Sequence, residues 1–92
     1  MTTHELKCWP YSFEALLEGM KTWEFRKDDR HYKVGDVLVL REFNPNMPPH
    51  VEYTGRIVRK RVTYVDYLTQ FGAPGFVGMT LGEVGDESTT TD

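Results

Sequence analysis

The 92-residue sequence has a single cysteine, Cys8, and no long hydrophobic run. One cysteine cannot form an intramolecular disulfide or a thiolate cluster around a metal ion, so the chain suits a reducing compartment. No segment approaches the roughly 18 apolar residues that a membrane-spanning helix requires. The opening residues MTTHELKCW lack the basic segment and apolar run of a secretory signal, and we therefore expect a cytoplasmic protein.

Motifs for phosphate loops and metal centres are also missing. Neither GxxxxGK followed by Ser or Thr nor GxGxxG occurs, which argues against the common glycine-rich nucleotide-binding loops. His4, His31 and His50 lie in three separate segments without the paired spacing of a zinc site. Cys8 and His4 would lie about 13 Å apart on one face of a strand, too far for a catalytic pair. The sequence therefore predicts no metal and no cofactor.

The net charge of -3 is unevenly distributed along the chain. Four acidic residues without basic neighbours follow residue 82, namely Glu83, Asp86, Glu87 and Asp92. Without these four, 11 basic residues stand against 10 acidic ones. A dedicated DNA-binding domain usually has a much larger basic excess, so the charge neither favours nor excludes a nucleic-acid partner.

The length fits one domain with a modest core. A chain of this size buries roughly 60–65% of the surface that it exposes when unfolded. We expect residues 1–84 to form this domain as a monomer. The low apolar content of residues 85–92 predicts an acidic, flexible tail.

The hydrophobic pattern predicts five strands and one early helix. Alternation of apolar and polar residues, or a short apolar run, predicts strands at 4–9, 22–27, 37–43, 52–66 and 76–84. Apolar residues at helical spacing predict a helix near 11–19, with Ser12 as its N-cap. Residues 67–75 have room for one further helical turn.

The predicted order β-α-β-β-β-β excludes a doubly wound parallel sheet, which needs a helix at each crossover. We expect a small β-barrel of five or six mostly antiparallel strands, capped by the helix, because closure removes exposed sheet edges. The residues expected in its core are Phe13, Leu16, Leu17, Trp23, Phe25, Val37, Val39, Leu40, Val62 and Leu81.

The segment GMKTWEFRKDDRHYKVGD, residues 19–36, differs from ordinary scaffold. It holds five basic and four acidic side chains with three aromatic residues between them. Strand alternation puts Trp23 and Phe25 on one face, which we expect to be the core face, and Glu24 and Arg26 on the other.

The same segment carries a resemblance to a known family. Residues 4–43 resemble the start of an ASCH-type domain, in the PUA-like superfamily of small RNA-associated β-barrels, and the resemblance continues through most of residues 4–81. The subgroup in question comprises small bacterial and phage proteins with an HxLK opening and a GxKxxExRxxDRx(F/Y)xxGD core. The matching positions are His4, Leu6, Lys7, Gly19, Lys21, Glu24, Arg26, Asp29, Arg30, Tyr32, Gly35 and Asp36.

The resemblance implies a cleft lined by Lys21, Glu24 and Arg26, and a partner such as RNA, a nucleotide or a modified nucleoside. Some ASCH proteins resemble amidohydrolases of acetylated cytidine, in which a lysine acts with a threonine three residues later and a glutamate elsewhere. Glu24 stands at the position of that threonine, so the hydroxyl nucleophile is missing here. Other members resemble ribonucleases that use Lys, Arg and Tyr, for which Tyr32 or Tyr64 is available.

A second basic group occurs in the long strand predicted at 52–66, namely Arg56, Arg59, Lys60 and Arg61. Arg59 and Arg61 share one face of that strand, and Lys60 lies on the other. Such residues can contact phosphates, or they can simply keep an edge strand soluble. Trp9, Tyr11 and Trp23 are candidates for base stacking, although we expect Trp23 to pack in the core or against the helix.

The sequence favours an RNA- or nucleotide-binding module over an enzyme, because no nucleophile is evident. The candidate ligand-binding residues are Lys7, Lys21, Glu24, Arg26, Arg30, Arg59 and Arg61. In the alternative, an enzyme acting on RNA or a modified nucleoside, Lys21 and Glu24 are the catalytic candidates. Two further alternatives stay open: a solvated salt-bridged face without a ligand, and a phage-type protein that binds a host protein.

Overall fold

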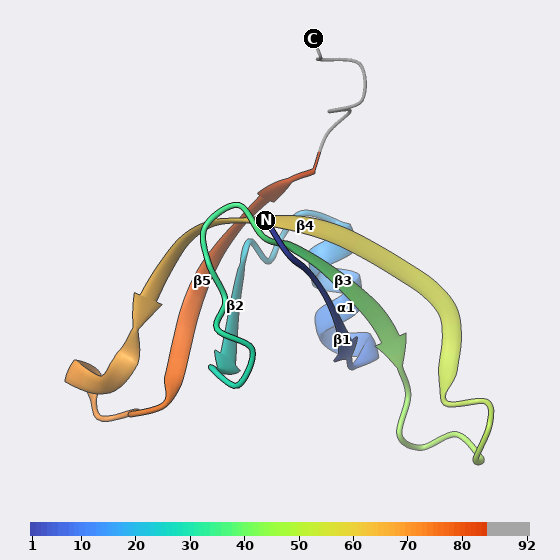
Figure 1. The fold of residues 1–92 in the computed structure, drawn as a ribbon. Coiled ribbons are helices and arrows are strands. Elements are labelled where there is room, and N and C mark those ends of the chain that lie inside the picture. The colour runs from blue at the N-terminus through green and yellow to red at the C-terminus, as the bar shows by residue number, and fades with distance from the viewer. Residues whose placement is uncertain (85–92) are drawn as a thin grey trace, which may run out of the picture.

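Five strands form one sheet in the order β1-β3-β4-β5-β2 (Figure 1). The computed structural model describes residues 1–84, and the tail predicted at 85–92 lies outside the described residues. The elements are β1 Thr3–Cys8, α1 Pro10–Leu17, β2 Trp23–Lys27, β3 Val37–Phe43, β4 Tyr53–Tyr67, the 3₁₀ turn η1 Leu68–Phe71, and β5 Phe76–Glu83. The predicted mainly β order with one early helix is confirmed. Within residues 1–84, no helix has the length and apolar character needed to cross a membrane.

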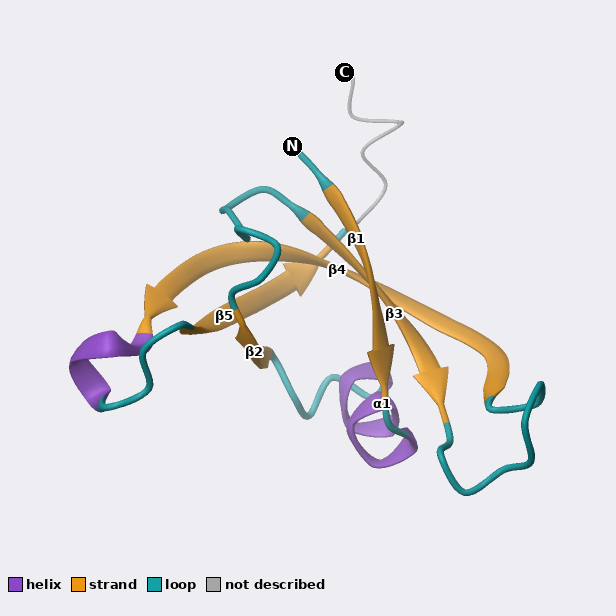
Figure 2. Ribbon diagram, turned by 60° about the horizontal axis from the view of Figure 1, so that its bottom comes forward, coloured by secondary structure: helices purple, strands orange, loops and turns teal. Residues whose placement is uncertain are grey.

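The sheet curls into a half-barrel. β1 pairs with β3 in parallel, and the other three strand pairs are antiparallel. The 15-residue β4 runs through the whole arch, and α1 lies on its concave side (Figures 1 and 2). Register shifts near Phe43 and Val62 accompany the bending, as β-bulges do. The strands β1 and β2 are the two edges of the sheet, so the expected barrel is half formed rather than fully closed.

The helix is held by tertiary contacts more than by caps. Trp9 is its N-cap without a side-chain hydrogen bond, and Pro10 occupies a position that suits proline. The predicted cap Ser12 lies instead inside the helix, so that prediction was wrong. At the other end Gly19 has a φ of 80°, and the Met20 N–H donates to the carbonyl of Ala15, which ends the helix in a left-handed turn.

Arg56 ties the helix to the sheet. Its guanidinium donates to both carboxylate oxygens of Glu42 on β3, at 2.8 and 3.0 Å, and also to Glu14 on α1. It lies 4.9 Å from the centre of the Phe13 ring. Hydrogen bonds from Arg56 and Thr54 hold the pKa of Glu42 below its ordinary value. This contact fixes α1 under the arch.

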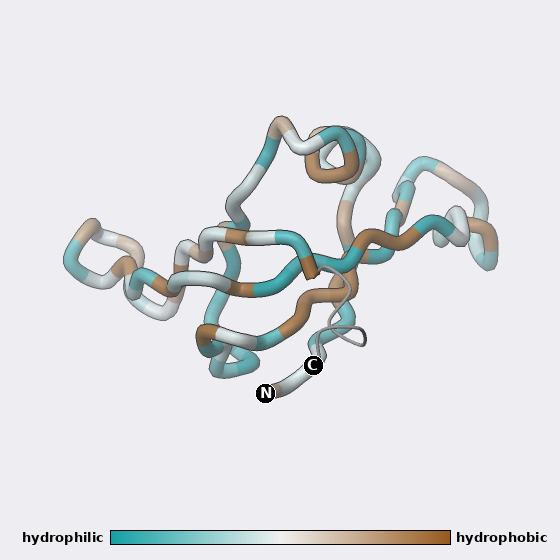
Figure 3. Tube along the Cα trace, turned by 90° about the horizontal axis from the view of Figure 1, so that it is seen from above, coloured by the Kyte–Doolittle hydropathy of each residue, from teal (hydrophilic) through white to brown (hydrophobic). Residues whose placement is uncertain are grey.

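The core lies between α1 and the concave face of the sheet. Hydrophobic segments recur along the helix and the strands in Figure 3. The buried apolar cluster contains Leu6, Cys8, Phe13, Leu16, Tyr32, Leu38, Leu40, Val62, Val77, Met79 and Leu81. Of the residues predicted for the core, six are buried: Phe13, Leu16, Val37, Leu40, Val62 and Leu81. Val39 is partly buried.

Three core predictions were wrong. Leu17, Trp23 and Phe25 are 49%, 52% and 51% exposed, respectively. Leu17 ends a helix of only eight residues, past the part that packs on the sheet. The two aromatic residues lie on the outer face of β2, because Glu24 takes the concave side and is only 5% exposed.

The loop between β2 and β3 is fastened to the N-terminus by Asp36. Its carboxylate accepts hydrogen bonds from the backbone N–H groups of Thr2 and Lys33, both at 3.0 Å, and lies 2.9 Å from the His4 ring. Tyr32 packs edge-on against His4 with ring centres 4.8 Å apart. Gly35, which precedes Asp36, has a left-handed φ of 97°. Asp36 therefore has a structural role in this loop.

We predict that Leu16→Ala lowers the free energy of unfolding by about 2–5 kcal/mol, because Leu16 is fully buried. Leu17→Ala removes the same atoms from a half-exposed site and should cost about 1 kcal/mol or less. Urea denaturation of both variants measures the difference. Equal losses would contradict the packing of α1 described above.

A second prediction concerns acid stability. Burial on its own would raise the pKa of Asp36, but the hydrogen bonds from His4, Thr2 and Lys33 outweigh it and hold the pKa below its ordinary value. The folded protein therefore binds this proton more weakly than the unfolded chain. The resulting stability is fully present above the ordinary pKa of about 4 and is lost as the pH falls through the lower folded value.

The variant Asp36→Asn has no carboxylate at this position and therefore lacks this pH-dependent contribution to stability. We expect it to be less stable than the wild type near neutral pH, and we expect the difference to shrink as the pH falls below about 4. Urea unfolding across that pH range measures the free energy of unfolding of the variant and of the wild type. Asp29→Asn is a change of the same kind in the exposed part of the loop. The free energy of unfolding of this control should vary with pH as that of the wild type does. A constant difference between Asp36→Asn and wild type at all pH values would refute the prediction.

Candidate functional site

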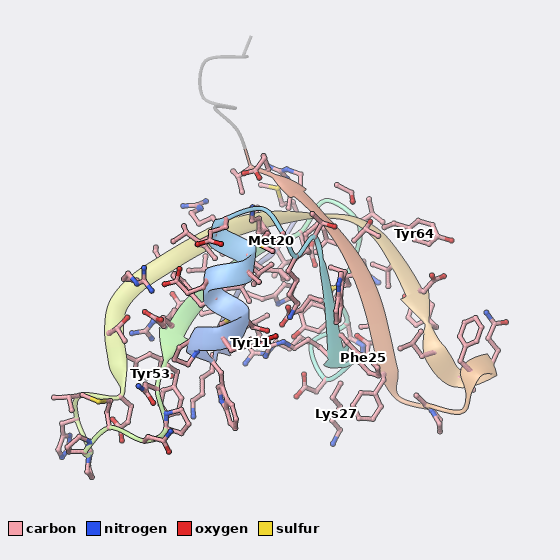
Figure 4. All side chains as sticks on the ribbon, turned by 180° about the vertical axis from the view of Figure 1, so that it is seen from behind. Tyr11, Met20, Phe25, Lys27, Tyr53 and Tyr64 are labelled. Atoms are coloured by element: carbon pink, nitrogen blue, oxygen red, sulfur yellow. The ribbon has the colours of Figure 1, made fainter. Side chains whose placement is uncertain are left out.

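A cavity of about 530 Å³ occupies the open side of the half-barrel. It lies between β2 and the junction of β1 with α1, so the two edge strands of the sheet form opposite walls. In Figure 4, Tyr11 at the start of α1 and Phe25 on β2 mark the two sides of this region. The lining residues are Lys7, Cys8, Trp9, Ser12, Lys21, Glu24, Phe25, Arg26, Lys27 and Phe76.

The carboxylate of Glu24 is the buried polar group of this cavity. Its side chain is 7% exposed. Oε2 accepts a hydrogen bond of 2.7 Å from Nε of Arg26. Nζ of Lys21 lies 3.5 Å from Oε1, an ion-pair distance, but Oε1 accepts no hydrogen bond from any residue in the described part of the chain. Buried polar atoms nearly always have a hydrogen-bond partner, so Oε1 is an exception among the described residues, with Nζ of Lys21 as its ion-pair partner.

The two cations paired with Glu24, Lys21 and Arg26, connect it to other elements. Arg26 donates from Nη2 to the backbone carbonyl of Lys7 at 2.6 Å, which bridges the two edge strands. Lys21 donates from Nζ to Oγ of Ser12 at 2.7 Å, which bridges to α1. The side chains of Lys21 and Arg26 are only 17% and 25% exposed, respectively. The network is therefore partly dehydrated, where charge-assisted hydrogen bonds are strong.

Exposed aromatic side chains flank this charged network. Trp9 is 62% exposed at the rim. On the opposite wall Phe25 and Phe76 pack edge to face, with ring centres 5.5 Å apart. Exposed aromatic faces next to cations are typical of sites that stack bases.

Cys8 also lines this cavity. Burial, followed by the nearby Glu24 charge, raises the pKa of the Cys8 thiol to about 11. The thiol is therefore protonated at neutral pH, and the thiolate that acts as a nucleophile is not populated. Within residues 1–84, no group of three or more His, Cys, Asp or Glu side chains is placed to hold a metal ion.

The structure brings four of the seven predicted binding residues to one cavity. Lys7, Lys21, Glu24 and Arg26 line it together, and Arg30 lines a second cavity beside it. Arg59 and Arg61 line neither of these cavities.

The basic group on β4 is divided among separate partners. Arg61 donates to the carbonyl of Gly35 at 2.8 Å. Lys60 is buried and pairs with Glu83 at 2.9 Å, so Glu83 has a basic partner that its sequence neighbours do not supply. Lys60 and Arg61, although adjacent in sequence, therefore have different partners within the protein.

The tyrosines considered for ribonuclease chemistry lie outside the cavity. Tyr32 is buried against His4, and burial raises the pKa of its hydroxyl. Tyr64 is exposed on β4 and lines another surface hollow. Sequence reasoning missed Ser12 and Phe76 as cavity residues, because each is brought there by contacts between distant segments that no local spacing reveals.

Comparison with known proteins places these residues in a family. Residues 3–77 match the family described as "Domain of unknown function (DUF3850)", and this range includes every residue that lines the cavity. The chain is 41% identical over 68 residues to "Uncharacterized 12.9 kDa protein in GpA 3'region" of Escherichia phage P2. The alignment covers 74% of this chain and 58% of the phage protein, so the chain spans less than two thirds of that relative. On the match over residues 3–77, the chain belongs to the DUF3850 family.

Proposed function

We propose that this chain is an RNA- or nucleotide-binding module of the ASCH type, within the PUA-like superfamily, and that the cavity between β1 and β2 receives a base. The observation that carries the proposal is Oε1 of Glu24, a buried carboxylate oxygen that has an ion pair with Lys21 but accepts no hydrogen bond from residues 1–84. A ligand N–H group would satisfy it. The ring N–H and amino groups of nucleobases are donors of this kind.

The surroundings of Glu24 suit the other parts of a nucleotide. Trp9, Phe25 and Phe76 offer aromatic faces for stacking. Lys7 and Lys27 are exposed cations at the same cavity and can contact a phosphate. A volume of about 530 Å³ lies within the usual range for small-ligand sites. In this proposal the protein acts as a monomer in the cytoplasm, where such ligands are abundant.

A second candidate function is hydrolysis of RNA or a modified nucleoside. Ser12 supplies a hydroxyl 2.7 Å from Nζ of Lys21, next to Glu24. A serine beside a lysine is a known pairing of nucleophile and base. The hydroxyl that is missing at position 24 is thus available from α1. The test is turnover of an N-acylated nucleoside or an RNA by the wild type and by Ser12→Ala. If the wild type shows turnover, and Ser12→Ala abolishes it but still binds the substrate, the enzyme is favoured over the binding module.

Glu24→Gln tests the binding proposal. The substitution keeps the size of the side chain and removes the charge that strengthens a hydrogen bond from the ligand. We expect it to weaken binding of a nucleoside or short RNA by about ten- to a hundredfold, the loss typical of a charge-assisted hydrogen bond. Isothermal titration against the four nucleosides, their monophosphates and short RNAs measures this effect.

Glu18→Gln is the matched control, because Glu18 is exposed at the end of α1 and does not line the cavity. It should bind like the wild type. Circular dichroism of each variant checks that the fold is retained. If Glu24→Gln binds every ligand as tightly as the wild type, Oε1 of Glu24 is not a ligand contact and the proposal fails.

Trp9→Ala tests the stacking surface separately. Trp9 is 62% exposed, so its removal should leave thermal stability almost unchanged. Loss of one base–aromatic stack costs about 1–3 kcal/mol, which corresponds to roughly 5- to 150-fold weaker binding. Phe71→Ala removes an equally exposed aromatic residue outside the cavity and should leave affinity unchanged. Equal affinities of Trp9→Ala and Phe71→Ala would show that Trp9 does not stack on the ligand.

A further inference from the structure

A second cavity of about 390 Å³ adjoins the first on the outer face of β1 and β3. The two cavities share Lys7 and Arg26. Arg30 from the loop after β2, Arg41 from β3 and Tyr53 from β4 complete most of its lining. The two cavities therefore meet at Lys7 and Arg26.

The second cavity is strongly basic. It has four cationic side chains, Lys7, Arg26, Arg30 and Arg41, and one carboxylate, Glu5. Glu5 is 69% exposed and reaches Arg41 only at 3.9 Å, so it neutralises little of this charge. Arg30 is exposed and forms no hydrogen bond or ion pair with another residue in the 1–84 range. The excess of positive charge favours an anion here.

Aromatic rings hold two of these cations in place. Nζ of Lys7 lies 4.5 Å from the centre of the Phe43 ring, and the Arg41 guanidinium lies 4.1 Å from that of Tyr53. The two rings themselves pack edge to face with centres 5.0 Å apart. Cations packed on rings lose less conformational freedom when they bind a ligand, which makes the cavity a prepared site for phosphate.

The chemistry of the first cavity suits a base, and that of the second suits a phosphate. The first combines a buried acceptor with aromatic faces, and the second combines four cations with a single exposed carboxylate. A mononucleotide placed in the first cavity would leave Arg30 and Arg41 without a partner in the ligand. A strand of at least two nucleotides would use both cavities.

We infer that the ligand is a single-stranded segment of nucleic acid with one unpaired base in the first cavity. This inference rests on the proposed function. The backbone crosses at Lys7 and Arg26, and the next phosphate lies in the second cavity with Arg30 and Arg41. The strand must be unpaired, because a base inside a duplex cannot turn its hydrogen-bonding edge toward Glu24.

Titration by fluorescence anisotropy and calorimetry tests this inference. Homo-oligomers of eight nucleotides, as RNA and as DNA for each base, are compared with the matching mononucleotides and with a duplex. The best oligomer should bind at least about tenfold tighter than its mononucleotide, with a steeper salt dependence. The duplex should bind more weakly than that oligomer.

Arg41→Gln and Arg30→Gln remove cations found only in the second cavity. Each should weaken oligomer binding by about tenfold and leave mononucleotide binding unchanged. Each should also reduce the slope of log K against log salt by about 0.7, the value for one phosphate contact on a single strand. Arg59→Gln, an exposed arginine of β4 outside both cavities, is the matched control and should change neither quantity.

The outcomes separate this inference from the proposed function. If the wild type binds mononucleotides and oligomers equally well, or if Arg30→Gln and Arg41→Gln match Arg59→Gln, the second cavity is not a strand site while the base site stands. If the wild type binds none of these ligands, both proposals fall. Selective loss of oligomer binding in both variants supports the inference.

Discussion

A single buried carboxylate sets the geometry of this domain's open side. Burying Glu24 is costly unless cations and hydrogen-bond donors surround it. Arg26 supplies one such contact and also reaches the backbone of β1, while Lys21 supplies the other and also reaches α1. The charge of Glu24 therefore gathers three elements around one point. The residues of this arrangement, Lys21, Glu24 and Arg26, line the cavity together.

The strands could be predicted from the sequence because the alternation of apolar and polar residues is a local property of each segment. The strand at 37–43 was placed correctly to the residue, and the others within one or two residues. Alternation also grouped Glu24 with Arg26, but it could not decide which face of β2 points inward. Aromatic residues usually face a core, and here that expectation failed because Glu24 finds its compensating cations on the concave side. Of these two cations, Arg26 lies on β2 itself and Lys21 lies just before the strand.

The candidate site was predictable only in part, for the same reason. Strand parity supplied two of its charged residues, and a family resemblance supplied Lys21. The contact between Ser12 and Lys21 requires α1 to pack beside β2, and the second cavity requires β1, β3 and the loop after β2 to converge. Such arrangements depend on the curl of the sheet. The basic residues of β4 looked like one group in sequence, yet Lys60 and Arg61 have separate partners.

The two edge strands of the half-barrel are joined differently from its other neighbouring strands, and this affects how the domain can deform. Neighbouring strands within the sheet are joined by ladders of backbone hydrogen bonds, but the edge strands β1 and β2 are linked through the side chain of Arg26. A ladder resists shear along its whole length, whereas the side-chain hydrogen bond from Arg26 to Lys7 resists it at one point. The domain is therefore stiff around the arch and compliant across its mouth. Its two edges can change their separation by exchanging one side-chain hydrogen bond, with every backbone ladder left intact.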